Sequence, residues 1–453
     1  MKKILIVILI LLLMASMISC GGEQATPDGE QNEHQEENVS QDVVLTETTN
    51  LTDASWKKTA SEDELDSYYD VLYSDTDTAQ KVRIASLSLF KSLAAKDIAE
   101  GKNTMISPLS FLTAMGLLEN GAAGDSLKEI ETAFGCDIES FNEWYDAWSK
   151  LIMLYGGDAL NIANSVWYKA DPTLVVSEDY LKKTAETYDA QAFEAPFDDK
   201  TLEDINGWVS DNTKGMIPAI LDKISKDAMM FLINATCFEG SWYEDYKDDQ
   251  IKGNEIFTRE DGTEEKATML YSREMDGRFY ENEYLTGTSK YYRDGFQISF
   301  FLPKEGVTVE DALAKLNGDE INDLMANGIL SDVDLVIPEF AFDYTAPKCI
   351  EALKEMGIVS VFDENGADLS PMASTTDGYN LYVNTVIHKT HIELDREGTK
   401  AAAATAIGIA KATALMQDVP LNEVRLDRPF IFVISDSQTS TPIFMGTVGS
   451  VEQ

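Results

Sequence analysis

The 453-residue chain has few of the residues that bind metals, form disulfide frameworks or carry out acid–base catalysis. It contains four cysteines and three histidines. Cys20 ends an N-terminal apolar segment, and Cys136, Cys237 and Cys349 follow at irregular spacing. An odd number of cysteines at such spacing is not a disulfide framework, and the chain has neither a CxxC pair nor a Cys/His cluster. We therefore expect three buried thiols and no metal site.

Motifs of common enzyme classes are also missing. The chain has no G-x-S-x-G, no HExxH and no glycine-rich phosphate loop. His388 and His391 stand three residues apart in a predicted strand, so their side chains would point to opposite faces and could not bind one metal ion. The prediction is a protein that is not an enzyme and has no cofactor.

Positive charge is scarce. The chain has 36 Lys and Arg against 79 Asp and Glu, which gives a formal net charge of −43. Such a charge repels phosphate backbones, so nucleic acids and heparin-like polymers are excluded as partners. Hydrophobic residues make up 44% of the chain, which is ample for a large core.

The N-terminus has the order of an export signal. Lys2 and Lys3 precede an apolar run over residues 4–13, and the sequence MASMISC follows and ends at Cys20. This cysteine resembles the lipidated cysteine of the bacterial lipobox, although Met17 stands where Leu is usual. We predict a lipoprotein signal peptide over residues 1–19, lipidation at Cys20, and an exported, membrane-anchored protein at the cell surface, or in the extracellular space if released. A plain cleaved signal or a retained anchor helix is the alternative.

The segment after the signal is predicted to be a tether. Residues 21–50 are polar, acidic and without aromatic side chains, so they cannot bury enough surface to fold. Residues 51–77 are transitional, because Trp56, Tyr68, Tyr69 and Tyr73 indicate partial order. The predicted organisation is therefore a lipidated cysteine and flexible acidic tether over residues 20–77, then a folded domain over residues 78–453.

The domain mixes helices and strands without regular βαβ alternation, which favours an α+β fold. The spacing of apolar residues predicts helices over 78–95, 108–118, 125–134, 177–192, 202–214, 308–325 and 346–356. It predicts strands over 160–169, 231–238, 296–302, 333–337 and 382–394, and a C-terminal hairpin of 430–434 and 443–448. The run 231–238 is apolar almost throughout, as in a strand buried on both faces.

Residues 393–416 (ELDREGTKAAAATAIGIAKATALM) differ from the rest of the domain. They are dominated by Ala, Thr and Ile, and beyond Thr399 only Lys400 and Lys411 carry charge. Composition alone favours a surface helix, since Ala is the best helix former. The neighbouring motifs favour another interpretation.

Four segments together resemble the serpin family. Residues 103–110 (NTMISPLS) resemble its N-I-x-x-S-P-x-S motif, and residues 231–242 (FLINATCFEGSW) resemble its central strand, with Glu239 where Lys is usual. Residues 388–405 resemble the hinge signature H-K-x-x-I-E-V-[N/D]-E-x-G-T-x-A-A-A-A-T, and the tail from residue 428 resembles the C-terminal hairpin. The resemblance covers about residues 78–450 in the family's order.

This resemblance implies three β-sheets, eight or nine helices and an exposed reactive-centre loop. It also implies a suicide-type serine protease inhibitor, in which the protease cuts the loop and is trapped as an acyl-enzyme while the loop inserts as a new central strand. If Thr399 points inward, strand alternation also buries Ala401, Ala403, Thr405, Ile407 and Ile409, all of them small or apolar. A non-inhibitory serpin and a surface-binding lipoprotein are the alternatives.

The resemblance assigns roles to individual residues. The hinge comprises Arg396, Glu397, Gly398, Thr399, Ala401, Ala402, Ala403, Ala404 and Thr405, with Arg396 where the family usually has Glu. The shutter, a polar cluster beneath the sheet, comprises Ser107, Ser110, Asn234 and His388, and Trp242 stands at the breach, where insertion begins.

Counting from the hinge places the reactive bond between Ala412 and Thr413, which favours an elastase-like protease with a small pocket. Lys411 would suit a trypsin-like protease, and Leu415 or Met416 a chymotrypsin-like one. Counting back from Arg428 moves the bond nearer to residues 417–418. We expect a monomer.

Overall fold

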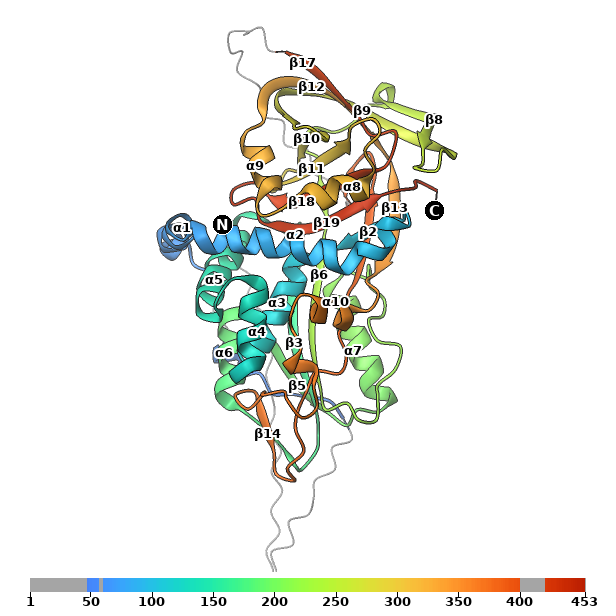
Figure 1. Ribbon diagram of the computed structural model, residues 1–453. Helices are drawn as coiled ribbons and strands as arrows, with labels where there is room; N and C mark the ends of the chain where they lie inside the picture. Colours follow the sequence, from blue (N-terminus) through green and yellow to red (C-terminus); the bar gives the residue numbers. More distant parts are fainter. Residues whose placement is uncertain (1–46, 57–59, 400–419, 453) are drawn as a thin grey trace, which may run out of the picture. The chain divides into compact units, whose positions relative to one another are not determined.

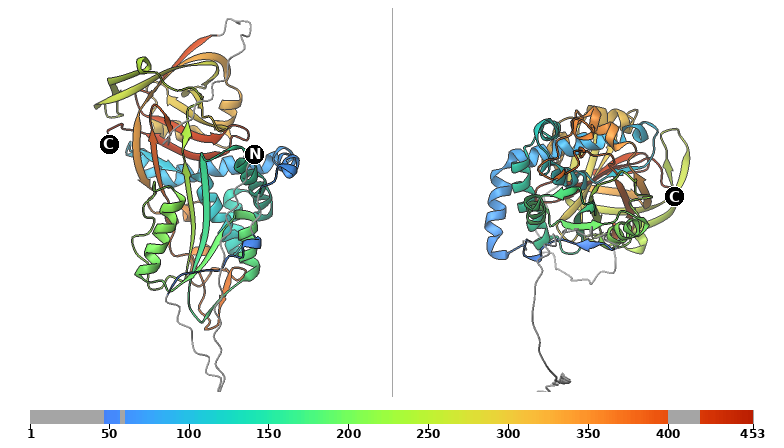
Figure 2. Two further views of the ribbon diagram at one scale, coloured as in Figure 1. Left: turned by 180° about the vertical axis from the view of Figure 1, so that it is seen from behind. Right: turned by 90° about the horizontal axis from the view of Figure 1, so that it is seen from below.

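The computed structural model describes residues 47–56, 60–399 and 420–452 (Figures 1 and 2). The predicted α+β class is confirmed. The described α-helices are α1 Leu65–Ser74, α2 Thr76–Ala99, α3 Pro108–Glu119, α4 Gly124–Phe134, α5 Ile138–Tyr155, α6 Glu178–Tyr188, α7 Asp199–Asn212, α8 Val309–Lys315, α9 Glu320–Ala326 and α10 Cys349–Glu355. These are ten helices, against the eight or nine expected. None of the helices in the described ranges combines the length and apolar character that a bilayer crossing requires.

The described strands form four sheets, where three were expected. One sheet has the order β1 (Thr49–Asn50), β5 (Gln191–Ala195), β3 (Leu160–Lys169), β6 (Met230–Phe238), and another has β13 (Phe340–Thr345), β15 (Lys389–Leu394), β16 (Gly398–Thr399), β7 (Gly240–Ser241). The nine-stranded sheet has the order β17 (Leu421–Arg425), β12 (Ile329–Pro338), β9 (Glu264–Glu281), β10 (Leu285–Tyr291), β11 (Phe296–Pro303), β18 (Phe430–Asp436), β19 (Pro442–Val448), β2 (Thr104–Ile106), with β8 (Ile251–Thr258) on β9. The fourth pairs β4 (Leu174–Val176) with β14 (Ala373–Thr375).

Two of the four sheets meet between β6 and β7. β7 follows β6 after the single residue Glu239, so the chain passes directly from one sheet to the other. β7 pairs with β16, whereas β6 pairs only with β3 among the described strands. The strand predicted over residues 382–394 is wrong for its first half, because strand geometry begins at Lys389. β13 ends at Thr345 opposite Lys389, so residues 382–387 have no strand to pair with on that side.

Residues ahead of the predicted domain boundary are also folded. β1 pairs antiparallel with β5, and α1 packs against α5 with Tyr68 and Leu72 buried. Residues 51–77 were predicted to belong to the tether but to be transitional, because Trp56, Tyr68, Tyr69 and Tyr73 indicate partial order. The apolar side chains of α1 stand at helical spacing and find a surface on α5, which supplies the burial that the segment alone lacks.

A second difference concerns the helix predicted over residues 308–325. The structure has two helices there, α8 and α9, and Gly318 between them adopts a positive φ of 56°. α8 has already ended at Leu316, whose backbone is extended with a ψ of 122°, and the left-handed Gly318 turns the chain toward α9. The hydrogen bond from the Asn317 amide to Glu320 Oε2 then starts this helix.

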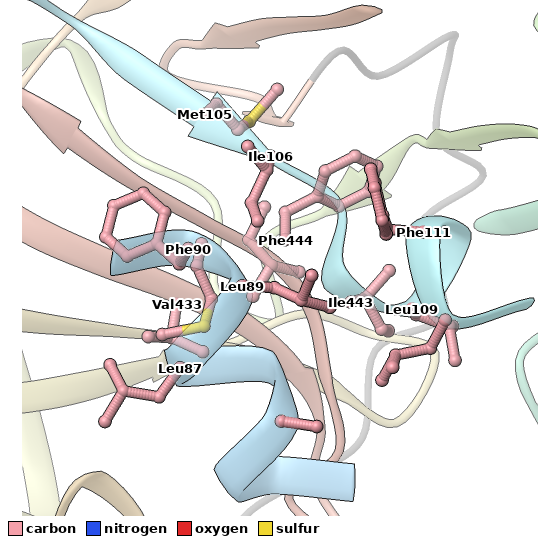
Figure 3. Packing of buried hydrophobic residues seen from close by; sticks show 14 of the residues in the cluster. Leu87, Leu89, Phe90, Met105, Ile106, Leu109, Phe111, Val433, Ile443 and Phe444 are labelled. Atoms are coloured by element: carbon pink, nitrogen blue, oxygen red, sulfur yellow. The ribbon is translucent and has the colours of Figure 1, made fainter. Parts of the chain in front are cut away.

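The main core joins the C-terminal hairpin to the first long helix. Figure 3 shows side chains of α2, β2, α3, β18 and β19 in one cluster, and its labelled members are Leu87, Leu89, Phe90, Met105, Ile106, Leu109, Phe111, Val433, Ile443 and Phe444. β6 lies between two helices, with α3 on one face and α7 on the other (Figures 1 and 2). This placement confirms the prediction that the apolar run 231–238 is a strand buried on both faces. Cys136, Cys237 and Cys349 are buried, as expected.

Candidate functional site

The predicted hinge enters a sheet. Gly398 and Thr399 form β16, which lies between β15 and β7. Thr399 is opposite Leu394 of β15 and Gly240 of β7, and Gly398 is opposite Ser241. Gly398 and Thr399, the last residues before position 400 that the structure describes, therefore lie in a strand between two neighbours, at the end of the gap between β6 and β15.

Two glycines allow this close pairing. A Cβ atom on Gly398 would lie 2.0 Å from the carbonyl oxygen of Gly240, and one on Gly240 would lie 2.5 Å from the ring of Phe238. No rotation of a side chain relieves the first clash, because the obstacle is backbone. Any larger residue at position 398 would push β16 away from β7.

Thr399 points into the core. Its side chain is 3% exposed, and its hydroxyl lies 2.6 Å from the hydroxyl of Tyr292. Burial raises the pKa of Tyr292 well above its usual value, so its hydroxyl keeps its proton and can donate. The sequence reasoning on loop alternation assumed an inward Thr399, and this position has that orientation.

Trp242 holds the turn that precedes the hinge. Its indole Nε1 donates to the carbonyl oxygen of Asp395 at 2.9 Å, and its backbone amide donates to the carbonyl oxygen of Glu397 at 3.1 Å. The ring is fully buried and stacks on Tyr292, with the ring centroids 4.7 Å apart. Trp242 thus contacts the chain on both sides of Arg396, which agrees with its predicted position at the breach.

A buried cation lies beside this stack. Lys290 Nζ is 2.9 Å from Glu274 Oε1 and lies over the rings of Trp242 and Tyr246, at 5.4 and 4.9 Å. Burial acts to lower the pKa of Lys290, but the charges of Tyr246 and Glu274 outweigh it and leave the pKa raised. The lysine stays charged, and its ammonium group holds the rings of Trp242 and Tyr246 in place through cation–π contacts.

Arg396, the residue that departs from the family pattern, has an acidic partner. Its Nε lies 3.6 Å from Oε1 of Glu339, in the turn between β12 and β13. The side chains are 47% and 26% exposed, so the pair is a surface ion pair worth about 0.3–1 kcal/mol. The departure from the family pattern at position 396 therefore places an arginine on the hinge and its acidic partner in the turn between two strands.

The predicted shutter residues form two groups. Ser107 caps α3 by accepting from the Ser110 amide at 3.1 Å, its hydroxyl donates to the Ile443 carbonyl at 2.7 Å, and its own amide donates to His388 Nε2 at 2.9 Å. Asn234 is not part of this group, which corrects the expectation of one hydrogen-bonded cluster. Its side chain donates to Asn164 Oδ1 at 2.7 Å on the neighbouring strand β3.

A cavity of about 460 Å³ separates the two groups. β6, α3 and residues 381–388 line it, and Ser110, Asn234 and His388 all reach it. Its walls carry apolar side chains such as Phe111 and Leu232. The cavity lies beside residues 230–234 of β6, on the edge away from β3. This edge has no strand partner among the residues that the structure describes, so the cavity occupies a place where a further strand would lie.

His388 is held in its neutral form. Burial lowers its pKa to about 4 from an ordinary 6.5. Nε2 accepts a hydrogen bond from the Ser107 amide, so this nitrogen carries no proton. A charge on His388 would turn that contact into a repulsion between two donors.

Some predicted residues lie outside the described ranges. These are Cys20, Ala401, Ala402, Ala403, Ala404, Thr405, Lys411, Ala412, Thr413, Leu415 and Met416. The described residues on either side are Thr399, at the end of β16, and Pro420, just before β17.

The site also contains residues that sequence reasoning missed. Tyr292, Glu339 and Asn164 each bond a predicted site residue from a distant part of the chain. Of these three residues, only the acidic Glu339 could have been anticipated, because an unexpected Arg at the hinge indicates an acidic partner. Tyr292 and Asn164 gave none, since tyrosines and asparagines are frequent in any domain.

The Arg396–Glu339 pair predicts a small coupled effect on stability. Arg396→Glu and Glu339→Arg should each lower the melting temperature by about 1–2 °C, because each places like charges together. The double variant restores an opposite pair and should melt within about 1 °C of the wild type. Thermal unfolding of the four proteins at low salt measures the coupling. Additive losses in the double variant would show that the two side chains do not interact.

His388 predicts a loss of stability in acid. Its pKa is about 4 in the folded protein and 6.5 when unfolded, so the unfolded chain binds more protons between these values. The stabilisation is complete above pH 6.5 and is lost as the pH falls toward 4, by about 3 kcal/mol in all.

Melting temperatures from pH 7.5 to 4 should therefore fall less steeply for His388→Gln, whose amide oxygen can still accept from Ser107, than for the wild type. Equal slopes for His388→Gln and the wild type would contradict the assignment.

Comparison with known proteins places this geometry in a family. The family model for "Serpin (serine protease inhibitor)" matches residues 81–451. Iripin-8 of Ixodes ricinus is 28% identical over 386 residues, which cover 81% of this chain and 91% of the relative. Neuroserpin of Gallus gallus is 28% identical over 385 residues, covering 81% of this chain and 90% of the relative.

Solved structures agree with the sequence matches. The native-state structure of tengpin, a thermophilic serpin, is similar with a TM-score of 0.73 and 33% identity, covering 87% of this chain and 96% of that one. Its latent-state structure is similar with a TM-score of 0.71 and 32% identity, covering 83% and 98%. Serpins are generally protease inhibitors and not enzymes. From residue 81 to residue 451, this chain belongs to the serpin family.

Proposed function

We propose that this serpin inhibits serine proteases by inserting its cut loop into the divided sheet. The observation that carries the proposal is the position of Gly398 and Thr399, which are paired as β16 between β15 and β7. Beyond Thr399 the chain continues into the alanine-rich segment, and the side of β6 along the cavity has no strand partner among the described residues. A strand that continued from β16 would enter this cavity.

The driving force comes from backbone groups. In the described parts of the chain β6 has a strand partner only on its β3 side, so a new strand would form hydrogen bonds along its other edge. Each bond contributes roughly 0.5–1.5 kcal/mol, and about ten of them contribute on the order of 10 kcal/mol. The inward Thr399 sets the alternation that buries Ala401, Ala403 and Thr405, so no charge enters the core.

The chemistry at the loop belongs to the protease. In this proposal its serine oxygen attacks the carbonyl carbon of Ala412, and the peptide bond to Thr413 breaks. The new amino group of Thr413 leaves with the C-terminal part of the chain, and Ala412 remains joined to the protease as an ester. A small residue at this position favours elastase-like proteases.

The same proposal covers location and assembly. A lipid on Cys20 and the acidic tether would hold the inhibitor outside the cell, where it meets foreign or self-derived proteases. The single inhibitory event needs one copy of the chain, and the net charge of −43 opposes association between copies. We therefore propose a monomeric, membrane-anchored inhibitor.

Incubation with pancreatic elastase tests this function. We expect a complex that survives SDS and a released C-terminal fragment that begins at Thr413, identified by mass spectrometry. A fragment that begins at Ala412, Met416 or Gln417 would assign the bond after Lys411, Leu415 or Met416 instead. Trypsin and chymotrypsin belong in the same experiment for that reason.

The alternatives give different results. A non-inhibitory serpin is cut without forming a complex and without a rise in melting temperature. A lipoprotein that only binds at the surface keeps its stability after the loop is cut. Either result with all the proteases would overturn the inhibitory proposal.

Thr399→Arg tests the insertion step. The wild-type side chain is 3% exposed and bonded to Tyr292, so an arginine would have to bury its charge before the loop could insert. We expect cleavage at the same bond and at least a tenfold lower yield of complex, measured by gel densitometry. Lys400→Arg is the matched control, because strand alternation predicts that position 400 faces solvent, and it should keep the wild-type yield. Unchanged yield for Thr399→Arg would contradict insertion in this register.

A further inference from the structure

Three large apolar side chains are exposed where the chain enters the nine-stranded sheet after the alanine-rich segment. Met275, Leu330 and Leu421 are between 47% and 55% exposed, whereas the neighbouring Ile329 pairs with the buried Phe279 and points to the opposite face. We call Met275, Leu330 and Leu421 the sheet-end patch. They come from three adjacent strands, β9, β12 and β17 (Figure 1). Single exposed apolar residues are common, but a group on neighbouring strands indicates a contact surface.

A bulge in β9 creates part of this patch. Ser331 and Val333 of β12 pair with Gly277 and Glu274 of β9, which leaves Met275 and Asp276 opposite Asp332 alone. Asp276 adopts a positive φ of 53°, and its amide donates to Asp332 Oδ1 at 3.1 Å. A bulge turns side chains out of the regular pleat, and this one leaves Met275 51% exposed.

The patch is fixed to the end of the loop. The carbonyl oxygen of Pro420 accepts from the Asp332 amide at 3.0 Å and from the Ser331 hydroxyl at 2.8 Å. Asn422 also donates to that hydroxyl at 2.8 Å, and Ser331 is fully buried. Leu421 lies between these anchors, opposite Asp332 in the parallel pair. The patch therefore keeps a defined position relative to the C-terminal anchor of the loop.

Acidic side chains surround the patch. Asp276, Asp332 and Glu423 are not paired with a cation among the described residues, whereas Asp334 is bound by Arg273 through two bonds of 2.6 and 2.9 Å. Arg278, opposite Leu330, donates to the Gly328 carbonyl oxygen. The surroundings carry an excess of negative charge. A partner that fits would present apolar side chains inside a basic rim.

We propose that the sheet-end patch is a second contact surface for the target protease, outside its active-site contact with the loop. The proposal rests on the proposed function. Eight residues separate Thr413 from Leu421, so the cut bond lies at most about 29 Å from the patch. A protease of about 230 residues has a radius of gyration of about 17 Å. A protease that binds the bond is therefore large enough to cover the patch.

Other occupants fit less well. An anionic membrane surface would meet the acidic rim with repulsion. If a second copy of this chain bound through its own sheet-end patch, the acidic side chains of the two copies would face and repel each other. A basic protease has the opposite charge, and its association would also be accelerated by the net charge of the inhibitor. The observations therefore favour the protease.

Association kinetics of full-length protein test the proposal. The variants are the double substitution Met275→Ser/Leu330→Ser and the charge reversal Glu423→Lys, measured with trypsin, chymotrypsin, pancreatic elastase and neutrophil elastase. For at least one protease that the wild type traps, we expect the double variant to lower the second-order rate constant of complex formation about tenfold. Glu423→Lys should reduce the dependence of that rate on salt. The cut bond and the final yield of complex should not change, because neither variant alters the loop or the cavity into which the loop would insert.

Met153→Ser is the matched control. Met153 is 55% exposed on α5, outside the nine-stranded sheet, and its substitution should leave every rate within twofold of the wild type. Unchanged rates for both patch variants with every trapped protease would overturn the patch proposal while leaving the inhibitory function intact. A wild type that traps none of the four proteases would overturn the function, and the patch proposal with it. A wild-type dimer that the double variant dissociates would assign the patch to a second copy and overturn its role in protease binding.

Discussion

The edge of β6 away from β3, which has no strand partner among the described residues, is the constraint on which the rest of the site depends. A strand buried between α3 and α7 normally has a neighbour on each side, because backbone groups left without partners are costly inside a protein. Here one side is occupied by β3, and the other faces a cavity of about 460 Å³. β16 fills the same position at the upper end, next to β7. Among the described residues, the strands run without interruption from β15 through β16 to β7, whereas β6 has a strand on one side only.

The polar groups around the cavity follow from this geometry. His388 and Asn234 cannot bond to each other across the gap, so each has found a partner on its own side. Ser107 is bonded to the N-terminus of α3, to the hairpin strand β19 and to His388. These contacts give the polar side chains on both sides of the cavity hydrogen-bond partners. The two described sheets can therefore remain separate without leaving these side chains unpaired.

The sequence predicted best the elements whose own residues carry a strong apolar pattern and which find strand partners in the fold. Residues 160–169 form β3 as predicted, and the apolar run at 231–238 forms β6 with one additional residue at its start. Residues 382–388 have equally good strand composition but no neighbour to pair with, so they form no strand. α1 shows the opposite case, because Tyr68 and Leu72 gain their burial from α5. For the same reason, resemblance could identify Trp242 and His388, but the partners Tyr292 and Asn164 became visible only when the fold brought them together.

The short strand β1 has a mechanical consequence if the chain is anchored through its N-terminus as proposed. β1 has only two residues and lies at the outer edge of its sheet, with β5 and β3 between it and β6. It is held by a few bonds, among them Leu51 to Ala192 at 2.8 Å and Thr48 to Asp204 at 2.7 Å. A pulling force on the N-terminal chain would peel β1 from β5 one bond at a time. The cavity beside β6 lies beyond the three strands β5, β3 and β6 and would carry little of that load, so tension on the N-terminal chain would be absorbed before it reached the proposed site of loop insertion.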